Sequence, residues 1–265
     1  MPAPWRLDDL EDYAAAHDDP FAGRVAPGER VQVALQVEAT ADPPIWTALG
    51  DGELDPWAAG LARIWLRLGL RAGDTIAFFD YGSNPAVLLS TKIFVAHLKK
   101  GATDRIGATA ICNDGVASMT ARMLGILESV KPAVLFVRRD LVAPLVDALG
   151  TRGMPAESRL RRAVIGETEG APEVAEAERL ERALAVPVSR WLRADAAFFL
   201  AADCTTCRRF HVDPRLYDAE PADDGDALVT ARFAARCPAV RYRIGGRWEP
   251  PGCTAEPRAR RIAWP

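Results

Sequence analysis

The sequence predicts an α/β fold with a mainly parallel sheet flanked by helices and, toward the carboxyl end, a small β-rich lobe. Between residues 75 and 184, apolar runs of strand length alternate four times with segments of helical periodicity. Strands connected by helices pair in parallel and are covered on their faces. Beyond residue 186 the apolar runs are short and separated by polar, proline or glycine turns, with cysteines at a metal-ligand spacing among them.

The amino-terminal part precedes this alternation. Residues 1–30 are predicted to form an irregular or weakly helical lead, because Pro20, Pro27 and Gly28 interrupt any long element. Residues 31–37 alternate apolar and polar side chains, as a half-buried strand does. Residues 54–68 carry apolar side chains at helical spacing and predict a helix.

The alternating region predicts the sheet and its helices. The predicted strands are residues 75–80, 108–112, 133–137 and 163–166. The predicted helices are residues 87–99, 115–130, 141–149 and 174–184. Ligands of such sheets bind at the carboxyl ends of the strands. The loops at residues 80–83, 113–115 and 166–169 are therefore candidates for one ligand site, although each alone has the composition of an ordinary turn.

The later lobe contains a candidate metal site. Cys204, Cys207 and His211 follow a C-x₂-C-x₃-H spacing, and Cys253 lies beyond a predicted hairpin. Thiolate and imidazole ligands in a set of four favour a closed, structural zinc site. The alternatives are ordinary buried thiols or a redox pair, but redox pairs usually open a helix after a strand, and no such pattern surrounds these cysteines.

Composition narrows the partners and the location. The chain has 265 residues, of which 49% are hydrophobic, and a formal net charge of -3. This charge gives no support for nucleic-acid binding. Acids occupy the amino-terminal stretch where a signal peptide has its apolar core, and no apolar run reaches the length of about 18 residues that a membrane span needs. We therefore expect a cytoplasmic location with no membrane partner.

Three domains are predicted from these changes of character. Residues 1–53 form the lead with a short strand and a loop, residues 54–186 form the α/β sheet domain, and residues 187–265 form the β-rich zinc-binding lobe.

Four segments, residues 70–75, 80–82, 191–195 and 241–246, together carry a family resemblance. They resemble segments of the adenylate-forming superfamily, specifically its phenylacetate-CoA ligase branch. Residues 70–75 resemble the branch's G-[VL]-x-x-G-D segment, and residues 80–82 resemble its aromatic-glycine loop. Residues 191–195 stand where the family has Y-G-x-[ST]-E, and residues 241–246 stand where it has R-Y-R-T-G-D. The resemblance covers about residues 54–262 and implies the fold of the large domain of these ligases.

The resemblance implies roles for individual residues. Asp195 stands in place of an acid that helps to hold Mg²⁺, and we assign it as a catalytic candidate. Arg241 and Arg243 belong to the motif whose last residue grips the ribose of AMP. The cofactors implied are AMP or ATP-Mg²⁺, or CoA.

The branch also carries a zinc ion, held by a Cys, a His seven positions later, and cysteines after the R-Y-R motif. Cys204, His211 and Cys253 match these places, and Cys207 would substitute for a ligand that the chain lacks beside Cys253. The resemblance thus implies the same four ligands for a structural zinc.

Other polar side chains are candidates because of their positions at loops. Tyr81, Ser83 and Glu167 are candidate ligand-binding residues. His97 is a candidate general base if its pKa stays near neutrality. The alternative for His97 is a surface or capping histidine near a helix end.

Three departures from the family fall on parts that handle ATP. Residues 39–47 stand where a glycine- and hydroxyl-rich phosphate loop is expected, and its Pro43 and Pro44 have no N–H to donate. Gly246 replaces the ribose-binding Asp. The small carboxyl-terminal lid domain with its lysine is missing, which implies truncation. Conventional ATP-dependent adenylation is therefore expected to be lost.

The sequence predicts a truncated, divergent ligase-like protein that retains a cleft for an acyl, aryl or CoA-type ligand. Its expected partner is a small carboxylate or an acyl thioester, and a homodimer or a partner protein is left open. One alternative is an active AMP-forming acyl- or aryl-CoA ligase that recruits its lid from a partner. The other is a non-catalytic scaffold or regulator in a biosynthetic complex.

Overall fold

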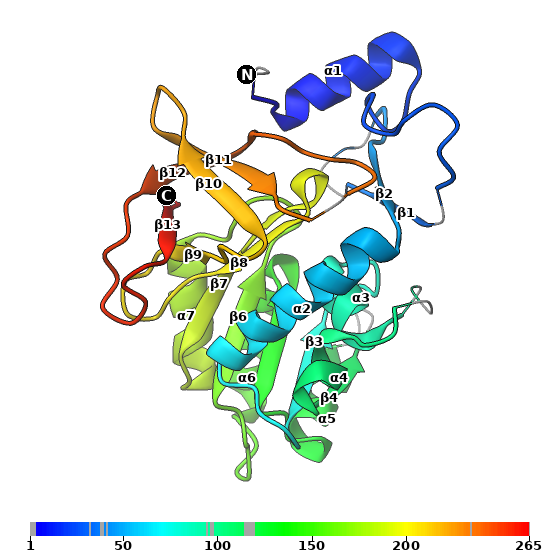
Figure 1. Cartoon of the computed structure of the whole chain (residues 1–265). Helices are drawn as coiled ribbons and strands as arrows, with labels where there is room; N and C mark the ends of the chain where they lie inside the picture. The colour runs from blue at the N-terminus through cyan, green and yellow to red at the C-terminus, as the bar shows by residue number, and fades with distance from the viewer. Residues whose placement is uncertain are drawn as a thin grey trace. The chain divides into compact units, whose positions relative to one another are not determined.

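A computed structural model of the chain describes residues 4–31, 33–37, 40, 42–93, 95, 98–113, 120–233 and 235–264 (Figure 1). The chain divides into two compact units. The first unit comprises Met1–Trp57, Thr168–Gly170 and Leu192–Pro265, and the second comprises Ala58–Glu167 and Ala171–Trp191.

The predicted parallel sheet is confirmed. Its order is β4-β3-β5-β6-β7-β8, and the paired strands from β4 to β7 run parallel. The strands are β3 (Thr75–Phe79), β4 (Thr109–Cys112), β5 (Val134–Arg138), β6 (Arg162–Gly166), β7 (Val188–Ala194) and β8 (Phe199–Ala202). Strand β7 was not predicted as a strand, and the chain passes from the second unit to the first within it.

Helices lie between the strands along the chain, as the alternation predicts. They are α2 (Asp51–Arg67), α3 (Pro85–Thr91), α4 (Ala102–Ile106), α5 (Thr120–Ser129), α6 (Arg139–Arg152) and α7 (Val174–Leu184). The predicted helix 87–99 is wrong in its extent, because α3 ends at Thr91 and Lys92 adopts a left-handed backbone with φ of 62°. The rest of that prediction includes His97, which lies outside the described residues.

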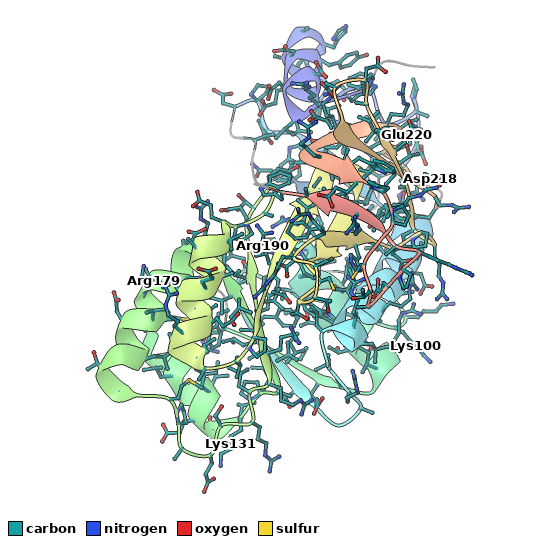
Figure 2. The ribbon with its side chains drawn as sticks, turned by 90° about the vertical axis from the view of Figure 1, so that its left-hand side faces the viewer. Lys100, Lys131, Arg179, Arg190, Asp218 and Glu220 are labelled. Carbon is teal, nitrogen blue, oxygen red and sulfur yellow. The ribbon has the colours of Figure 1, made fainter. Side chains whose placement is uncertain are left out.

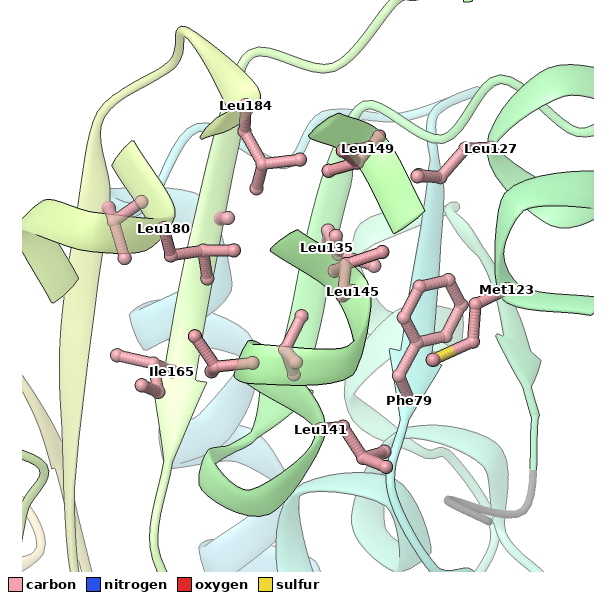
Figure 3. Close-up of a cluster of buried hydrophobic side chains, with 14 of the residues drawn as sticks. Phe79, Met123, Leu127, Leu135, Leu141, Leu145, Leu149, Ile165, Leu180 and Leu184 are labelled. Carbon is pink, nitrogen blue, oxygen red and sulfur yellow. The ribbon is translucent and has the colours of Figure 1, made fainter. Parts of the chain in front are cut away.

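One face of the second unit's sheet packs on helices α5, α6 and α7 (Figure 3). Successive strand residues point to opposite faces, so Phe79, Leu135 and Ile165 project toward these helices. Leu145 on α6 and Leu180 on α7 are fully buried in the same cluster. This burial explains why the strands are almost uninterrupted apolar runs in the sequence.

The opposite strand residues form an aromatic cluster in the same unit. Trp65 of α2 stacks on Trp191 with ring centroids 5.2 Å apart and meets Phe78 and Phe136 edge-on. Its indole N–H donates to Ser90 Oγ at 3.0 Å. The helical spacing that predicted α2 thus reflects a buried face of this helix.

The first unit contains the predicted β-rich lobe. Its five-stranded antiparallel sheet has the order β10-β11-β12-β13-β9. The strands are β9 (Phe210–Val212), β10 (Tyr217–Pro221), β11 (Asp226–Ala231), β12 (Tyr242–Glu249) and β13 (Arg260–Ala263). Along β10, buried Tyr217 and Ala219 alternate with exposed Asp218 and Glu220, which are labelled in Figure 2.

The amino-terminal segments belong to the same unit. Helix α1 (Leu7–His17) lies where an irregular or weakly helical lead was predicted, and Asp18 ends it with a left-handed backbone. Strands β1 (Val33–Gln36) and β2 (Trp46–Leu49) form an antiparallel pair on either side of the predicted loop. Among the described helices, none combines the length and the apolarity needed to cross a membrane.

Candidate functional site

The four predicted metal ligands converge in the first unit. Cys204 and Cys207 lie in the turn between β8 and β9, His211 lies on β9, and Cys253 lies in the loop between β12 and β13. Strand β13 pairs with both β12 and β9, and in this register Arg261 is opposite His211. The antiparallel pairing therefore brings the distant Cys253 loop beside the C-x₂-C turn.

The ligand atoms of these residues have the spacing of a metal site. All four lie within 4.8 Å of one another. The sulfurs of Cys204 and Cys253 are 3.7 Å apart, and Cys207 Sγ is 3.2 Å from His211 Nε2. A tetrahedral zinc with metal–sulfur bonds of about 2.3 Å separates its sulfur ligands by about 3.8 Å. The donor set and its spacing therefore fit a structural zinc ion.

The surroundings of the cluster support the same interpretation. His211 is buried, and its Nδ1 is 2.8 Å from Glu256 Oε2, which fixes the ring so that Nε2 faces the thiols. Burial acts to raise the pKa of the Cys253 thiol, but backbone N–H groups of Glu256 and Ala255 donate to it, and the resulting pKa is lowered. These contacts favour the thiolate form of Cys253. Burial raises the pKa of the Cys207 thiol to about 11, and a bound metal ion would stabilise its thiolate.

A second group of charged side chains surrounds Asp195. Asp195 begins the 3-10 turn Asp195–Ala197 directly after β7 and is 6% exposed. Arg193 is 1% exposed, and its guanidinium binds both oxygens of Asp195, with Nε 2.6 Å from Oδ1. A buried pair with this two-point geometry holds the Asp195 carboxylate in its charged form.

Glu169 lies beside this pair. Its Oε2 accepts the backbone N–H of Asp195 at 3.3 Å. Burial and, after it, the negative charge of Asp195 raise the pKa of Glu169 to about 8. Ionising both of two neighbouring carboxyl groups is unfavourable, because their negative charges repel each other. Because Arg193 holds Asp195 charged, Glu169 is the member of the pair that keeps its proton.

Thr40 and Ile45, in the loop between β1 and β2, use their hydrogen-bond donors within the loop. Thr40 Oγ1 donates to the carbonyl of Val37 at 2.8 Å and accepts the N–H of Ile45 at 3.0 Å. The N–H of Thr40 also donates to Val37. A phosphate-binding loop needs such groups directed at the ligand. The N–H groups of Thr40 and Ile45 and the Thr40 hydroxyl are instead bonded within the loop.

Trp264 packs against three glycines of the first unit. A Cβ atom added to Gly170 would lie 2.7 Å from the Trp264 ring, and one added to Gly246 would lie 3.0 Å from it. The same ring is 3.3 Å from the Cβ position of Gly245. The Trp264 indole therefore occupies space that side chains at these three positions would take up.

Three predicted ligand-binding residues, Tyr81, Ser83 and Glu167, lie in the loops after the parallel strands β3 and β6. Tyr81 and Ser83 are exposed in the loop after β3, and the Arg138 guanidinium lies 3.9 Å above the Tyr81 ring. Glu167 follows β6 and pairs with Arg139 at 2.8 Å. The sequence interpretation did not identify either arginine, although Arg138 ends β5 at the predicted edge of the sheet.

Arg241 and Arg243 are bound by acids of the first unit. Arg241 pairs with Glu220 of β10 at 2.8 Å. Arg243 contacts Asp224 at 2.5 Å and Asp226 at 2.7 Å. Both guanidinium groups therefore take part in cross-strand ion pairs.

No model of a protein family matches the sequence, and no curated protein matches it either. Solved structures do resemble the fold. An open conformation of 2-hydroxyisobutyryl-CoA ligase, in complex with 2-HIB-AMP and CoA, superposes with a TM-score of 0.76 and 18% sequence identity. The match covers 98% of this chain and 62% of the ligase chain.

Two other structures extend the comparison. The amide bond synthetase McbA from Marinactinospora thermotolerans has a TM-score of 0.59 at 12% identity, covering 88% of this chain and 48% of McbA. A benzoate CoA ligase from Burkholderia xenovorans has a TM-score of 0.53 at 13% identity, covering 89% and 50%. The expected likeness to adenylate-forming ligases is thus confirmed at the level of the fold.

The raised pKa of Glu169 predicts a pH dependence of stability. The folded chain holds this proton up to about pH 8, whereas the unfolded chain releases it near the ordinary value of 4.5. The free energy of unfolding should therefore fall as pH rises between these values and level off above about 8. Glu169→Gln should remove this component.

The measurement is urea unfolding at pH 5.5 and pH 8. Glu178→Gln is the matched control, because Glu178 is exposed on α7. The control should keep the pH dependence of the original chain. If Glu169→Gln keeps it as well, Glu169 does not carry the proton.

Proposed function

We propose that this chain is a phenylacetate-CoA ligase-like protein of the cytoplasm that binds a small carboxylate or its acyl thioester. We further propose that it does not carry out conventional ATP-dependent adenylation. The observation that carries this proposal is the buried ion pair between Arg193 and Asp195. The family resemblance assigns Asp195 to Mg²⁺, but the Asp195 carboxylate is already bound by Arg193 of the preceding strand β7.

Two further features support the loss of nucleotide activation. The N–H groups of Thr40 and Ile45 and the Thr40 hydroxyl are bonded within the β1–β2 loop, which leaves these three donors unavailable to a triphosphate. Gly246 stands in place of a ribose-binding Asp, and the Trp264 indole packs on its backbone. Each feature removes a different contact to the nucleotide.

The class of ligand is taken from the structural neighbours. The 2-hydroxyisobutyryl-CoA ligase structure contains an acyl adenylate and CoA. The chain spans 62% of the length of that protein. An acyl or aryl carboxylate and its CoA thioester are the ligands that such a scaffold is built to hold.

We also propose that Cys204, Cys207, His211 and Cys253 hold a structural zinc. The ion would supply a cross-link between the β8–β9 turn and the β12–β13 loop. Four protein ligands complete a tetrahedral shell and leave no open position for water or substrate. Glu256 would orient His211 from outside this shell.

Nucleotide titration tests the proposed function. The original chain should show no ATP-Mg²⁺ binding at millimolar concentrations and no carboxylate-dependent release of pyrophosphate. Trp264→Ala should increase the affinity for AMP because it uncovers Gly245, the neighbour of Gly246. Trp248→Ala is the matched control, because Trp248 lies on β12 and is partly buried, as Trp264 is. This variant should leave AMP binding unchanged.

Calorimetry and a pyrophosphate assay supply these measurements. Carboxylate-dependent pyrophosphate release by the original chain would contradict the proposal and restore an active ligase. Failure to bind acyl-CoA as well as nucleotides, together with a stable co-purifying protein, would favour a scaffold.

Metal analysis tests the zinc proposal. The original chain should contain about one equivalent of zinc, because the four ligands form one shell. Cys204→Ser should lose the metal and lower the melting temperature. Cys112→Ser is the matched control, because Cys112 lies in β4, outside the cluster. Equal zinc content and equal melting temperatures in Cys204→Ser and the original chain would show that the cluster is not a metal site.

A further inference from the structure

The first unit contains a cavity of about 400 Å³ that none of the proposed functions uses. Helix α1, residues 22–24 after it and residues 238–240 before β12 supply most of its lining. Its walls include the aromatic rings of Trp5, Tyr13 and Tyr242, and Arg24 contributes the cationic group. Aromatic walls with a single charged group are typical of sites for small organic ions.

Arg24 is only partly satisfied by its protein contacts. Its Nε donates to the carbonyl of Phe21 at 3.0 Å, and its two terminal nitrogens donate to those of Ala196 and Trp46 at 2.9 Å each. A guanidinium has five N–H donors. Among the described contacts of Arg24, one N–H on each terminal nitrogen therefore has no acceptor and could bind a ligand.

The charge of Arg24 also lacks a paired anion. No ion pair of Arg24 occurs within the part of the chain that the structure describes. The negative charge of Asp19 acts to raise the pKa of Arg24 without forming an ion pair with it, and both Asp19 carboxylate oxygens accept backbone N–H groups, from Phe21 and Gly23. Burial raises the pKa values of Cys237 and Tyr242, so these neighbours are neutral near pH 7.

An unpaired cation in such a place is costly. Burial lowers the pKa of Arg24. A guanidinium nevertheless stays protonated in proteins, so the cavity carries a standing positive charge. A role as a structural link explains the three bonds to carbonyls, but these bonds supply no negative charge. An anionic ligand would supply it.

We propose that this cavity is a binding site for a small carboxylate with a planar apolar body. The carboxylate accepts the remaining N–H groups of Arg24, and the planar body packs among Trp5, Tyr13 and Tyr242. Arg24 fixes the charge of the ligand, and the rings fix its flat shape. The inference goes beyond the proposed function, because it places a carboxylate at Arg24, and of the residues assigned to the nucleotide or the metal only the 241–246 segment contributes, through Tyr242.

Calorimetric titration of the full chain with benzoate tests this site, with benzamide as the neutral analogue of equal shape. Benzoate should bind, and benzamide should bind at least about tenfold more weakly, because it lacks the charge that Arg24 attracts. Arg24→Leu should reduce benzoate affinity at least as much. Arg152→Leu is the matched control, since Arg152 is an exposed arginine at the end of α6, and it should leave binding unchanged.

A second variant covers the case in which Arg24→Leu fails to fold. Val240 lines the cavity and is 43% exposed, so Val240→Trp fills the opening and keeps Arg24. It should weaken benzoate binding about tenfold or more. Absence of benzoate binding, equal affinity for benzamide, or unchanged binding in folded Val240→Trp would each overturn the proposal. The titration contains no nucleotide and no CoA, so its outcome is separate from that of the nucleotide test.

Discussion

The ion pair between Arg193 and Asp195 constrains the chemistry of the first unit. Both side chains are almost fully buried, so neither charge is satisfied by water. Removing one partner would leave the other as an uncompensated buried charge, which commonly costs about 3–5 kcal/mol. The pair therefore keeps Asp195 ionised and bound. Glu169 responds by keeping its proton, and the acid proposed for Mg²⁺ is used within the protein instead.

The cysteine and histidine cluster has a different physical basis. Cys204 and Cys207 are brought near each other by a local turn, whereas Cys253 depends on the pairing of β13 with both β9 and β12. A metal ion at this place would join local and distant segments and would reduce the freedom of the unfolded chain. In the first unit, the end of β7 is thus stabilised by an ion pair, and the β8–β9 turn and the β12–β13 loop would be stabilised by the proposed zinc.

Much of the fold was predictable because burial on both faces of a parallel sheet leaves continuous apolar runs in the sequence. Helix α7 was predicted with its observed bounds, since its buried leucines recur every turn. The end of α3 was not predictable, because Lys92 adopts its left-handed conformation in a sequence without a glycine or proline at that point. The spacing of the cysteines identified the metal cluster. The contacts of Arg24 and Trp264 were not predictable, because they join segments that are distant in sequence. The pairing of Arg193 with Asp195 was not predictable either, because no sequence motif marks it.

The Asp195 carboxylate is bound and held in its charged form by Arg193. A double-mutant cycle with Arg193→Met, Asp195→Asn and the double variant measures this coupling through the free energy of unfolding in urea. We predict that each single substitution is strongly destabilising and that the double variant costs less than the sum by about 2 kcal/mol or more. Additive costs, within about 0.5 kcal/mol, would show that the two side chains are not coupled and would contradict the account.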